Sequence, residues 1–228
     1  MFLWLNDGVQ RMDNSISHLN MIKQQLRTGH VIDEKILSLF SDLPRAYFVP
    51  DDMKSFAYSD LQISLEHNER MMTPLEEATL LQHLDLQGHE TILEVGTGTG
   101  YLTALLSRLC HNVISVDYYQ DFTEHARAHL QTFDCHNVTL ITGDASMGWA
   151  HLAPYDVIIF TGSLPQLCKT QQLQVLPGGK LFALVGALPA IQGRLYRLSH
   201  EGHWHDDILF ETALPYLINA ESKHHFIF

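Results

Sequence analysis

A glycine-rich segment directly after a short apolar run constrains the fold of this chain more than any other feature. The apolar run Thr91–Val95 is followed by Gly96-x-Gly98-x-Gly100 and then by Tyr101. Glycine adopts backbone conformations with positive φ that other residues avoid, so a segment of this kind makes a tight turn. The pattern therefore predicts a β-strand, a turn and then a helix over Tyr101–Leu109.

The chain after residue 85 alternates strand-like and helix-like segments. Strands are predicted over Thr91–Val95, Asn112–Val116, Val138–Thr142, Tyr155–Thr161, Lys180–Val185, Leu195–Leu198 and Ile208–Ala213. Further helices are predicted over Asp121–Thr132 and Lys169–Val175, and a turn at Pro177-Gly178-Gly179. Alternation of this kind is typical of a parallel sheet with helices on both faces, and the last two strands have the pattern of antiparallel ones. We therefore expect the α/β class, with a Rossmann-like, doubly wound, mostly parallel seven-stranded sheet.

Residues 11–85 have a different pattern, because apolar residues recur at helical spacing without intervening strands. A first helix is predicted to end at Gly29, a second to begin after Asp33 as its N-cap, and a third to open at Thr73-Pro74. No linker rich in glycine, serine or proline separates this region from the rest. We therefore expect the whole chain, residues 1–228, to form one domain, with an N-terminal helical cap over 11–85 and a Rossmann-like core over 86–219.

Polar residues follow the predicted parallel strands at the points where those strands end. Glu94 precedes the glycine loop, Asp117 follows the second strand, Asp144 follows the third, and Thr161-Gly162 follow the fourth. In open α/β sheets, ligands bind beyond the carboxyl ends of the strands. These residues are therefore candidates for one binding site.

The glycine spacing favours S-adenosylmethionine (SAM) over a phosphate ligand. A dinucleotide fingerprint would carry a third glycine where Tyr101 stands, and a P-loop would require a Gly-Lys-Ser/Thr sequence that is absent here. The carboxylate of Glu94 would repel a phosphate, whereas it suits the positive amino group of the methionine part of SAM. The sequence therefore predicts a SAM-binding methyltransferase that releases S-adenosylhomocysteine (SAH).

The remaining parts of SAM are assigned to the residues that follow the second, third and fourth strands. Asp117 is expected to accept hydrogen bonds from the ribose hydroxyls, and Asp144 one from the adenine amino group. Tyr118 and Ala145 are expected to sandwich the purine. The predicted cofactor-binding set in this half of the chain is Glu94, Gly96, Thr97, Gly98, Gly100, Tyr101, Asp117, Tyr118, Asp144, Ala145, Thr161 and Gly162. The alternative interpretation is a glycine turn with acids that merely cap helices.

Composition excludes several classes of partner. The formal net charge is -12 and no run of basic residues occurs, which argues against a nucleic acid, because phosphate binding needs clustered Lys and Arg. The segment Met1–Asp7 lacks the basic start and long apolar core of a signal peptide, and no apolar stretch reaches the ~18 residues that span a bilayer. Three widely spaced cysteines suggest a reducing compartment. We therefore expect a cytoplasmic protein without a membrane partner.

Histidine is frequent, with 15 residues, and this raises the question of a metal site. The clusters His200–His205 and His224-His225 match neither an HExxH helix nor a Cys/His ligand set. We therefore expect no metal centre.

Several motifs together resemble the protein-L-isoaspartate O-methyltransferase family over about residues 17 to 190. They are Met21-x-x-x-Gln25-Leu26, Leu43-Pro44-Arg45-x-x-Phe48-Val49-Pro50, Ala57-Tyr58-x-Asp60, the glycine loop Leu93–Tyr101, Pro154–Ile158 and Leu176–Leu181. The Pro-Arg-x-x-Phe-Val-Pro element is the most specific of them. The resemblance implies SAM-dependent methylation of the carboxylate of isoaspartyl residues in damaged proteins, which is a repair activity. It also implies isoaspartyl-containing peptides or proteins as partners.

The sequence departs from the family pattern in the loop that the resemblance assigns to the substrate. The family resembles Thr-Ile-Ser-Gln-Pro there, whereas this chain reads Arg70-Met71-Met72-Thr73-Pro74. Met72 stands at the serine position and is assigned to the cofactor site, and Thr73 supplies the hydroxyl expected to orient the acceptor. Thr73 is thus the predicted catalytic residue.

Two further departures follow the third and fourth strands, where Asp144-Ala145 replaces Asp-Gly and Thr161–Pro165 replaces an alanine-rich run. Two alternatives therefore stay open. One is methylation of a different acceptor, such as a small-molecule carboxylate or hydroxyl, and the other is a non-catalytic SAM-binding scaffold.

Overall fold

The computed structural model describes residues 16–220, which form two compact units. The first unit extends to Gln82 and the second begins at His83, so the boundary falls within helix α3 (Pro74–Leu84). This boundary is close to the one predicted after residue 85. That the two regions make a single domain with a packed cap stays a prediction.

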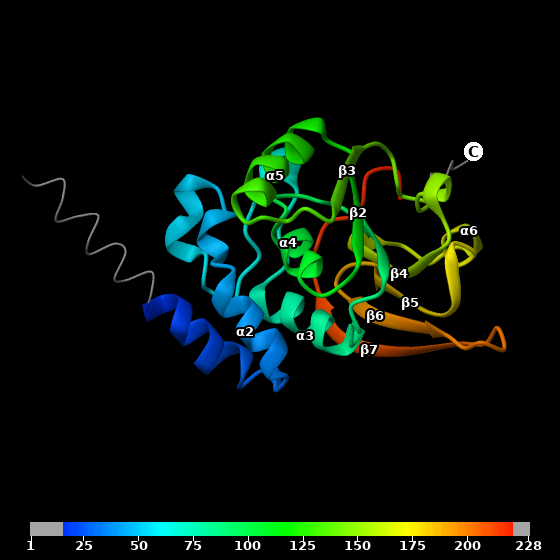
Figure 1. Ribbon diagram of the computed structural model, residues 1–228, viewed down its shortest axis with the longest axis horizontal. Helices are drawn as coiled ribbons and strands as arrows, with labels where there is room; N and C mark the ends of the chain where they lie inside the picture. The colour runs from blue at the N-terminus through cyan, green and yellow to red at the C-terminus, as the bar shows by residue number, and fades with distance from the viewer. Residues whose placement is uncertain (1–15, 221–228) are drawn as a thin grey trace, which may run out of the picture. The chain divides into compact units, whose positions relative to one another are not determined.

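The first unit is built from short helices, as its sequence pattern predicts. Residues 16–20 are helical and continue into the π-helical segment η1 (Met21–Leu26). The remaining elements are α2 (Glu34–Asp42), the 3₁₀ helices η2 (Arg45–Tyr47), η3 (Asp51–Phe56) and η4 (Glu66–Asn68), and α3 (Figure 1). The segment η1 lies within the first predicted helix, whereas the three 3₁₀ helices were not predicted, because such short helices have too few residues to show a period.

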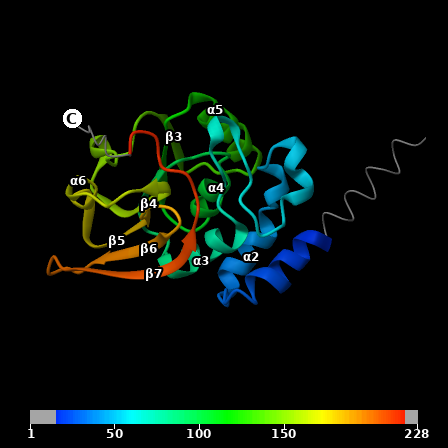
Figure 2. The ribbon, with the colours of Figure 1, turned by 180° about the vertical axis from the view of Figure 1, so that it is seen from behind.

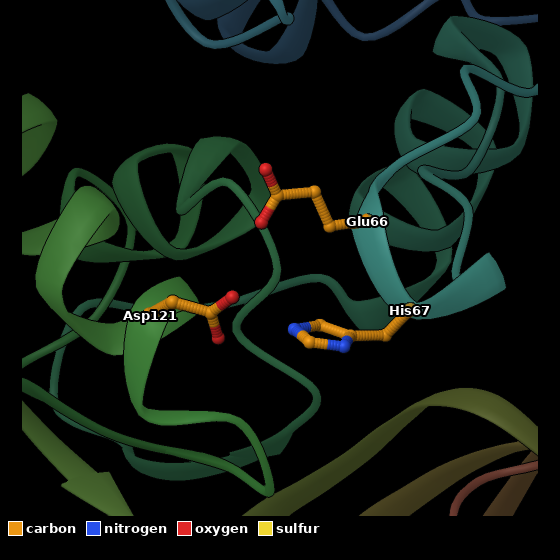
Figure 3. Close-up of side chains that lie close together, drawn as sticks. All are labelled: Glu66, His67 and Asp121. Atoms are coloured by element: carbon orange, nitrogen blue, oxygen red, sulfur yellow. The ribbon is translucent and has the colours of Figure 1, made fainter.

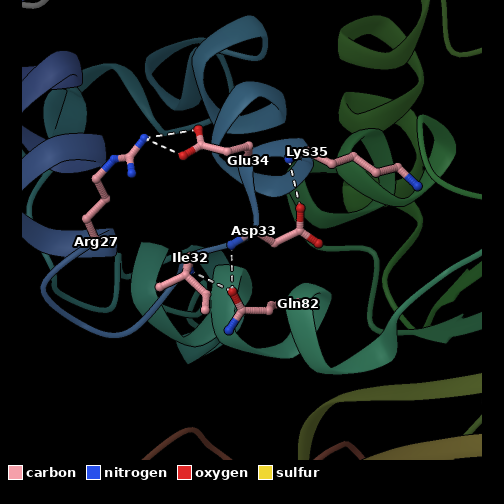
Figure 4. A network of polar contacts seen from close by, with 6 residues as sticks. All are labelled: Arg27, Ile32, Asp33, Glu34, Lys35 and Gln82. Carbon is pink, nitrogen blue, oxygen red and sulfur yellow. Dashed lines mark hydrogen bonds and ion pairs between the residues drawn. The ribbon is translucent and has the colours of Figure 1, made fainter.

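The start of α2 has the predicted cap and an additional support from α3. The Asp33 carboxylate accepts a hydrogen bond from the Lys35 backbone N–H at 2.8 Å (Figure 4). The Gln82 amide oxygen accepts from the backbone N–H groups of Ile32 and Asp33, at 2.8 and 3.0 Å. The left-handed residue after the first helix is His30, with φ 67°, so the prediction that Gly29 makes this stop was one residue early.

The short helix η4 lies in an exposed stretch before the predicted substrate loop. Glu66 and His67 are exposed, and Figure 3 shows both side chains extending from the backbone. His67 and the next residue, Asn68, have positive φ of 57° and 61°. The chain then returns so that Arg70 pairs with Ser64 in an isolated antiparallel bridge. This turn delivers the chain to the loop of residues 70–73.

The second unit contains the predicted seven-stranded sheet. Its strands are β1 (Thr91–Val95), β2 (Asn112–Asp117), β3 (Val138–Thr142), β4 (Tyr155–Leu164), β5 (Val175–Val185), β6 (Ile191–Leu198) and β7 (Trp204–Thr212). They lie in the order β3-β2-β1-β4-β5-β6-β7. The first five are parallel, while β6 and β7 are antiparallel to their neighbours. The predicted fold class is therefore confirmed.

The strand order determines where the helices of this unit lie. From β1 the chain crosses through α4 (Tyr101–Ser107) to β2 and through α5 (Gln120–Thr132) to β3, and from β4 it crosses through α6 (Lys169–Gln172) to β5. Right-handed crossovers that run in opposite directions along a sheet put their helices on opposite faces. Figures 1 and 2 accordingly show α4 and α5 on one side of the sheet and α6 on the other.

Four strands are longer than predicted by several residues because of pairings with other segments. Strands β6 and β7 were predicted to begin at Leu195 and Ile208, but they begin at Ile191 and Trp204 because they pair with each other along their length. Strand β4 was predicted to end at Thr161, but it continues to Leu164 because, after a register shift, its last two residues pair with Leu184 and Val185 of β5, and Ser163 also bridges to Tyr216. Strand β5 was predicted from Lys180, but it begins at Val175, which pairs with Tyr155. The predicted turn at Pro177–Gly179 is therefore an irregularity within β5, and the predicted helix from Lys169 ends at Gln172.

Among residues 16–220, no helix combines the length and the apolar character that crossing a bilayer requires.

Candidate functional site

The strand order reverses between β1 and β4, and this reversal positions the candidate site. Strand β1 pairs with β2 on one side and with β4 on the other, and the connections after β1 and β4 leave in opposite directions. A crevice at the carboxyl ends of the strands is the usual ligand site of such sheets. The glycine loop follows β1 at this point.

Two glycines of the loop are required by the chain's own packing. Gly96 has φ 100°, and a Cβ there would lie 2.1 Å from the hydroxyl oxygen of Thr161. Gly100 has φ 83°, and its Cβ would lie 2.9 Å from the Cβ of Ala126 on α5. The loop is thus held tightly against β4 and α5. Besides the tight turn that the sequence predicts, contacts within the chain therefore demand glycine at both positions.

Glu94 is fully buried and belongs to a network of hydroxyl groups. Its Oε2 accepts hydrogen bonds from Thr103 on α4 and from Ser115 on β2, both at 2.6 Å. Ser115 has one proton, which it gives to Glu94, so the 2.6 Å contact between the hydroxyls of Thr97 and Ser115 has Thr97 as its donor. The side chain of Thr97 therefore faces this network, and only its backbone is available to a ligand.

The other carboxylate oxygen of Glu94 gives the site its electrostatic character. Oε1 is buried and has no hydrogen-bond partner among the residues that the structure describes. Burial raises the pKa of Glu94 to about 7, against the lowering effect of the Ser115 and Thr103 hydrogen bonds. An unsatisfied buried oxygen costs about 1–3 kcal/mol. A cationic donor at Oε1 would remove this cost, so the site fits the ammonium group of an amino acid.

Asp117 fixes the glycine loop and keeps capacity for a ligand. Its Oδ2 accepts from the Gly98 backbone N–H at 2.8 Å, and its Oδ1 accepts from the Tyr119 backbone N–H at 3.0 Å. Burial raises the pKa of Asp117, while backbone hydrogen bonds, first that of Gly98, lower it. A carboxylate offers about four acceptor positions, and backbone N–H groups of Gly98, Tyr119 and Thr97 use up to three of them, so capacity remains for a ribose hydroxyl. The residue thus joins the end of β2 to the loop after β1.

Asp144 is exposed and is held from two directions. Its Oδ1 accepts from the Ser146 backbone N–H at 3.0 Å, and its Oδ2 accepts from the Asn219 side chain at 2.9 Å. Partial burial raises the pKa of Asp144, but these hydrogen bonds outweigh it and lower the pKa below its ordinary value. The buried Gln171 side chain donates to the Ser146 carbonyl at 2.6 Å. The turn that carries Asp144 is therefore held by Gln171 of α6 on one side and by Asn219, which follows β7, on the other.

A segment after β7, residues 214–220, covers the end of β4, and we call it the C-terminal strap. The backbone N–H of Ser163 donates to Pro215 and its hydroxyl to Leu214, both at 2.8 Å. Leu217 fills the space beside Gly162, where a Cβ would lie 2.7 Å from its Cδ2. The strap reaches Asp144 through Asn219. It therefore links the ends of β3 and β4.

Thr161 uses its hydroxyl within the chain. Its Oγ1 lies 3.0 Å from the Val95 carbonyl oxygen and 2.9 Å from that of Gly96, so its single proton is committed to the end of β1. Thr161 thus fixes the start of the glycine loop rather than presenting a donor to a ligand.

The predicted aromatic and apolar contacts to the purine differ in exposure. Tyr118 is 47% exposed, and its ring packs edge-on against Tyr119 with centroids 5.3 Å apart. Ala145 is buried in the core cluster of the second unit, and Tyr101 is buried at the start of α4. Only Tyr118 presents a broad open surface to solvent. The purine sandwich stays a prediction.

Met72 and Thr73 belong to the first unit and are fixed there by backbone and side-chain bonds. The backbone N–H of Thr73 donates to the Glu76 carboxylate at 2.7 Å, and the Thr73 hydroxyl accepts from the Glu76 backbone N–H at 3.2 Å. This is a reciprocal capping box at the start of α3. The Met72 side chain is buried, and its carbonyl oxygen accepts from Arg45 at 2.6 Å.

The hydrogen bonds join most of the predicted site residues of the second unit. Asp117 binds the backbone of Gly98, Thr161 binds that of Gly96, and Asp144 is tied to the C-terminal strap. Asp121, whose side chain Figure 3 shows, lies in the first turn of α5 and was not predicted as a site residue. Its carboxylate accepts a hydrogen bond from the Phe122 backbone N–H at 3.0 Å. The partners Thr103 and Ser115 were missed, although a polar residue within an apolar strand or helix is a signal for them. Asn219 had no such signal.

Comparisons with known proteins point to a single family. Residues 16–206 match the profile of the family described as Protein-L-isoaspartate(D-aspartate) O-methyltransferase (PCMT). The chain is 34% identical over 203 residues to protein-L-isoaspartate O-methyltransferase 2 of Pelobacter propionicus, which covers 88% of this chain and 90% of that protein. It is 37% identical over 154 residues to the Myxococcus xanthus protein-L-isoaspartate O-methyltransferase, covering 68% of this chain and 73% of the relative.

Solved structures share the fold at lower identity. One protein-L-isoaspartate O-methyltransferase superposes with a TM-score of 0.73 at 22% identity, covering 89% of this chain, which spans 65% of the length of that chain. A Plasmodium falciparum structure, described as a putative protein-L-isoaspartate O-methyltransferase in complex with SAH, gives a TM-score of 0.73 at 16% identity. The coverage is 88% of this chain and 97% of that one. These likenesses support the fold.

Proposed function

Because this chain belongs to the protein-L-isoaspartate (D-aspartate) O-methyltransferase family, we propose that it transfers the methyl group of SAM to isoaspartyl carboxylates in damaged proteins. The observation that carries the proposal is the family match over residues 16–206, because it includes both the glycine loop and the loop of residues 70–73. The backbone nitrogen of the next residue in the substrate then displaces methanol from the ester to form a succinimide, which water reopens partly to normal aspartate. The activity is thus one of protein repair.

The second unit supplies groups that suit each part of SAM. The unsatisfied Oε1 of Glu94 is proposed to accept from the ammonium group of the methionine part. Asp117 is proposed to accept from the ribose hydroxyls and Asp144 from the adenine amino group, since each carboxylate keeps acceptor positions beyond its internal bonds. When bound, SAM supplies a methyl group on a positively charged sulfur.

The acceptor chemistry asks little of the protein in proton transfer. A carboxylate has a pKa of about 4, so it is ionised and nucleophilic at neutral pH without a general base. What the chain must do is hold the acceptor oxygen in line with the methyl group and exclude water. Hydrogen-bond donors near the acceptor would serve this alignment.

Thr73 is proposed to be the residue that orients the acceptor. Its hydroxyl oxygen accepts from the Glu76 N–H, so its proton remains available for donation to an acceptor oxygen. Met72 stands where the family has serine, which leaves Thr73 as the hydroxyl of this loop. Methylation of another acceptor is the second candidate, and this same Met72 substitution favours it.

Partner and location follow from composition. The net charge of -12 supports a protein acceptor rather than a nucleic acid. All three cysteines are free, which supports a reducing compartment such as the cytoplasm.

The test is transfer of labelled methyl from SAM to an isoaspartyl peptide, compared with the same peptide containing normal aspartate. We expect transfer to the isoaspartyl peptide alone. SAM binding by calorimetry without transfer to it would refute the repair activity and favour the second candidate.

Two variants test the role of Thr73. Thr73→Ser keeps both the helix cap and the hydroxyl, and we expect it to retain transfer. Thr73→Val removes both, and the lost cap alone costs about 1 kcal/mol of stability. We therefore expect a drop in kcat/KM of at least tenfold at temperatures where both variants are fully folded. Equal kcat/KM for the two variants would remove Thr73 from the acceptor site.

A further inference from the structure

Arg45, within the Pro-Arg-x-x-Phe-Val-Pro element, occupies an unusual position for an arginine. The residue is fully buried, with an exposed fraction of 0%. Its Nη1 forms an ion pair with the Glu77 carboxylate on α3, and Glu77 is itself only 2% exposed. Its Nη2 donates to the Met72 carbonyl oxygen at 2.6 Å. One guanidinium thus connects a helix to the backbone of the loop that carries Thr73.

Stability alone is a weak reason for this arrangement. Removing two charges from water costs several kcal/mol, and a well-packed apolar pair of similar size is often as stable as a buried ion pair. An apolar pair would lack directional hydrogen bonds. The guanidinium is planar and rigid, so its Nη1 and Nη2 groups hold Glu77 and the Met72 carbonyl in a fixed relation to each other.

The rest of the loop is fixed by bonds of its own. The Met71 backbone N–H donates to the Ile63 carbonyl at 2.9 Å, and the Thr73 carbonyl accepts from the Glu77 backbone N–H at 3.1 Å. The capping box fixes Thr73 and Glu76 to each other. The Met72 carbonyl is held differently, by the charged Arg45 side chain from a segment 27 residues away.

We propose that Arg45 is a positioning residue for the loop of residues 70–73: paired with Glu77, it holds the Met72 carbonyl and so sets the place of the Thr73 hydroxyl. The proposal rests on the proposed function, in which Thr73 contacts the acceptor. Arg45 itself does not touch the acceptor. It acts through one peptide unit, because the Met72 carbonyl belongs to the same peptide plane as the Thr73 N–H.

The test must remove the guanidinium without leaving a buried unpaired charge. The double variant Arg45→Met/Glu77→Leu replaces the ion pair with apolar side chains of similar volume. Arg45→Lys keeps a charge for Glu77 but lacks the planar fork that also reaches Met72. Each is measured in the full chain by thermal melting, by calorimetric titration with SAH, and by steady-state transfer to an isoaspartyl peptide.

We expect the double variant to melt cooperatively and to bind SAH within about threefold of wild type, because the acids proposed to hold it, Glu94, Asp117 and Asp144, follow residue 82 and only Met72 of the predicted cofactor set lies in the loop. We expect its KM for the peptide to rise and its kcat to fall, with kcat/KM reduced at least 20-fold and Arg45→Lys intermediate. A folded double variant with kcat/KM within twofold of wild type would overturn the proposal. If the double variant does not fold, the SAH affinity and the kcat/KM of Arg45→Lys decide instead.

A second readout separates this proposal from the proposed function. Amide hydrogen exchange of Met71 and Thr73 reports the anchoring of the loop without any catalysis. We expect exchange at least tenfold faster at these amides in the double variant, relative to amides of β1 and β2 in the same protein. Unchanged exchange refutes the anchor even if transfer is lost. If the wild type transfers no methyl group to the isoaspartyl peptide, the proposed function is refuted. The hydrogen-exchange result still tests whether Arg45 anchors the loop.

Discussion

Two buried glutamates, one in each unit, differ in how their charge is compensated. Glu77 in the first unit is paired with the Arg45 guanidinium. Glu94 in the second unit receives hydrogen bonds from two hydroxyl groups, and its Oε1 has no partner among the described residues. The first charge is balanced within the chain, so that region is complete as a scaffold. The second keeps an electrostatic cost that a cationic ligand can remove, and this marks it as a binding site.

The largest expected effect comes from breaking the internal balance in the first unit. In Glu77→Gln, the Arg45 charge stays buried without a counter-charge, and removal of one member of a buried pair costs about 3–5 kcal/mol. We expect this loss of unfolding free energy in denaturant titrations, with SAH affinity unchanged.

The matched control is the exposed pair formed by Arg27 and Glu34, whose side chains are 48% and 74% exposed. Glu34→Gln should cost at most about 1 kcal/mol, because water screens an exposed pair. Similar losses at Glu34 and Glu77 would contradict the distinction between the two kinds of ion pair.

The pH dependence of stability tests the other side of the comparison. Burial raises the pKa of Glu94 to about 7 from an ordinary value of 4.5. The folded protein therefore binds this proton more tightly than the unfolded chain, so its stability falls as pH rises from 4.5 to 7. We expect the wild type to lose about 3 kcal/mol relative to Glu94→Gln over this interval. Parallel curves for the two proteins would mean that Glu94 is ionised throughout.

Ligand affinity should respond to Glu94 but not to Glu77. In Glu94→Gln, the amide oxygen can still accept from Thr103 and Ser115, which turns the NH₂ group toward the Oε1 position. A donor then meets the ammonium donor of SAH, and loss of a charged hydrogen bond of about 1.5–3 kcal/mol weakens binding roughly 10- to 150-fold. Calorimetric affinities of the two glutamine variants, measured side by side, check this. Equal SAH affinities of Glu94→Gln and Glu77→Gln would contradict the distinction between the two glutamates.

The sequence predicts the second unit better than the first, for a physical reason. Strands β1 and β3 have the predicted bounds because local signals, the glycine loop and Gly143-Asp144, end them. Strand β4 runs past its predicted end because its last residues pair with β5 and because Ser163 also bridges to the C-terminal strap, some 50 residues later. Local patterns determine where a strand can begin or end, whereas long-range pairing determines where it does.

The candidate site shows the same limit. The acids at the strand ends were predicted from their positions. The spacing Thr-x-x-Glu is also a local signature of the Thr73–Glu76 capping box. The use of Asp117 to hold Gly98, and the Arg45–Glu77 pair, join residues 19 and 32 positions apart. Such pairings depend on the packed structure and leave no local signature.

The smallest expected effect concerns the C-terminal strap. Asn219→Ala removes one exposed hydrogen bond to Asp144, worth about 0.5–1 kcal/mol, so SAH affinity should fall roughly two- to fivefold. If Asp144 binds the adenine amino group, the preference for SAH over its inosyl analogue should shrink in the same variant. An unchanged preference would separate Asn219 from adenine recognition.

The unsatisfied oxygen of Glu94 is proposed to receive the ammonium group of the cofactor, and proton release on binding tests this most directly. At pH 7 a group with a pKa of about 7 is about half protonated, and a cation beside it favours the charged form. Titration with SAH in buffers of different ionisation enthalpy should therefore show release of up to about half a proton per bound ligand. This release should disappear in Glu94→Gln. Binding that releases no proton in wild type, or the same number in the variant, would contradict the claim.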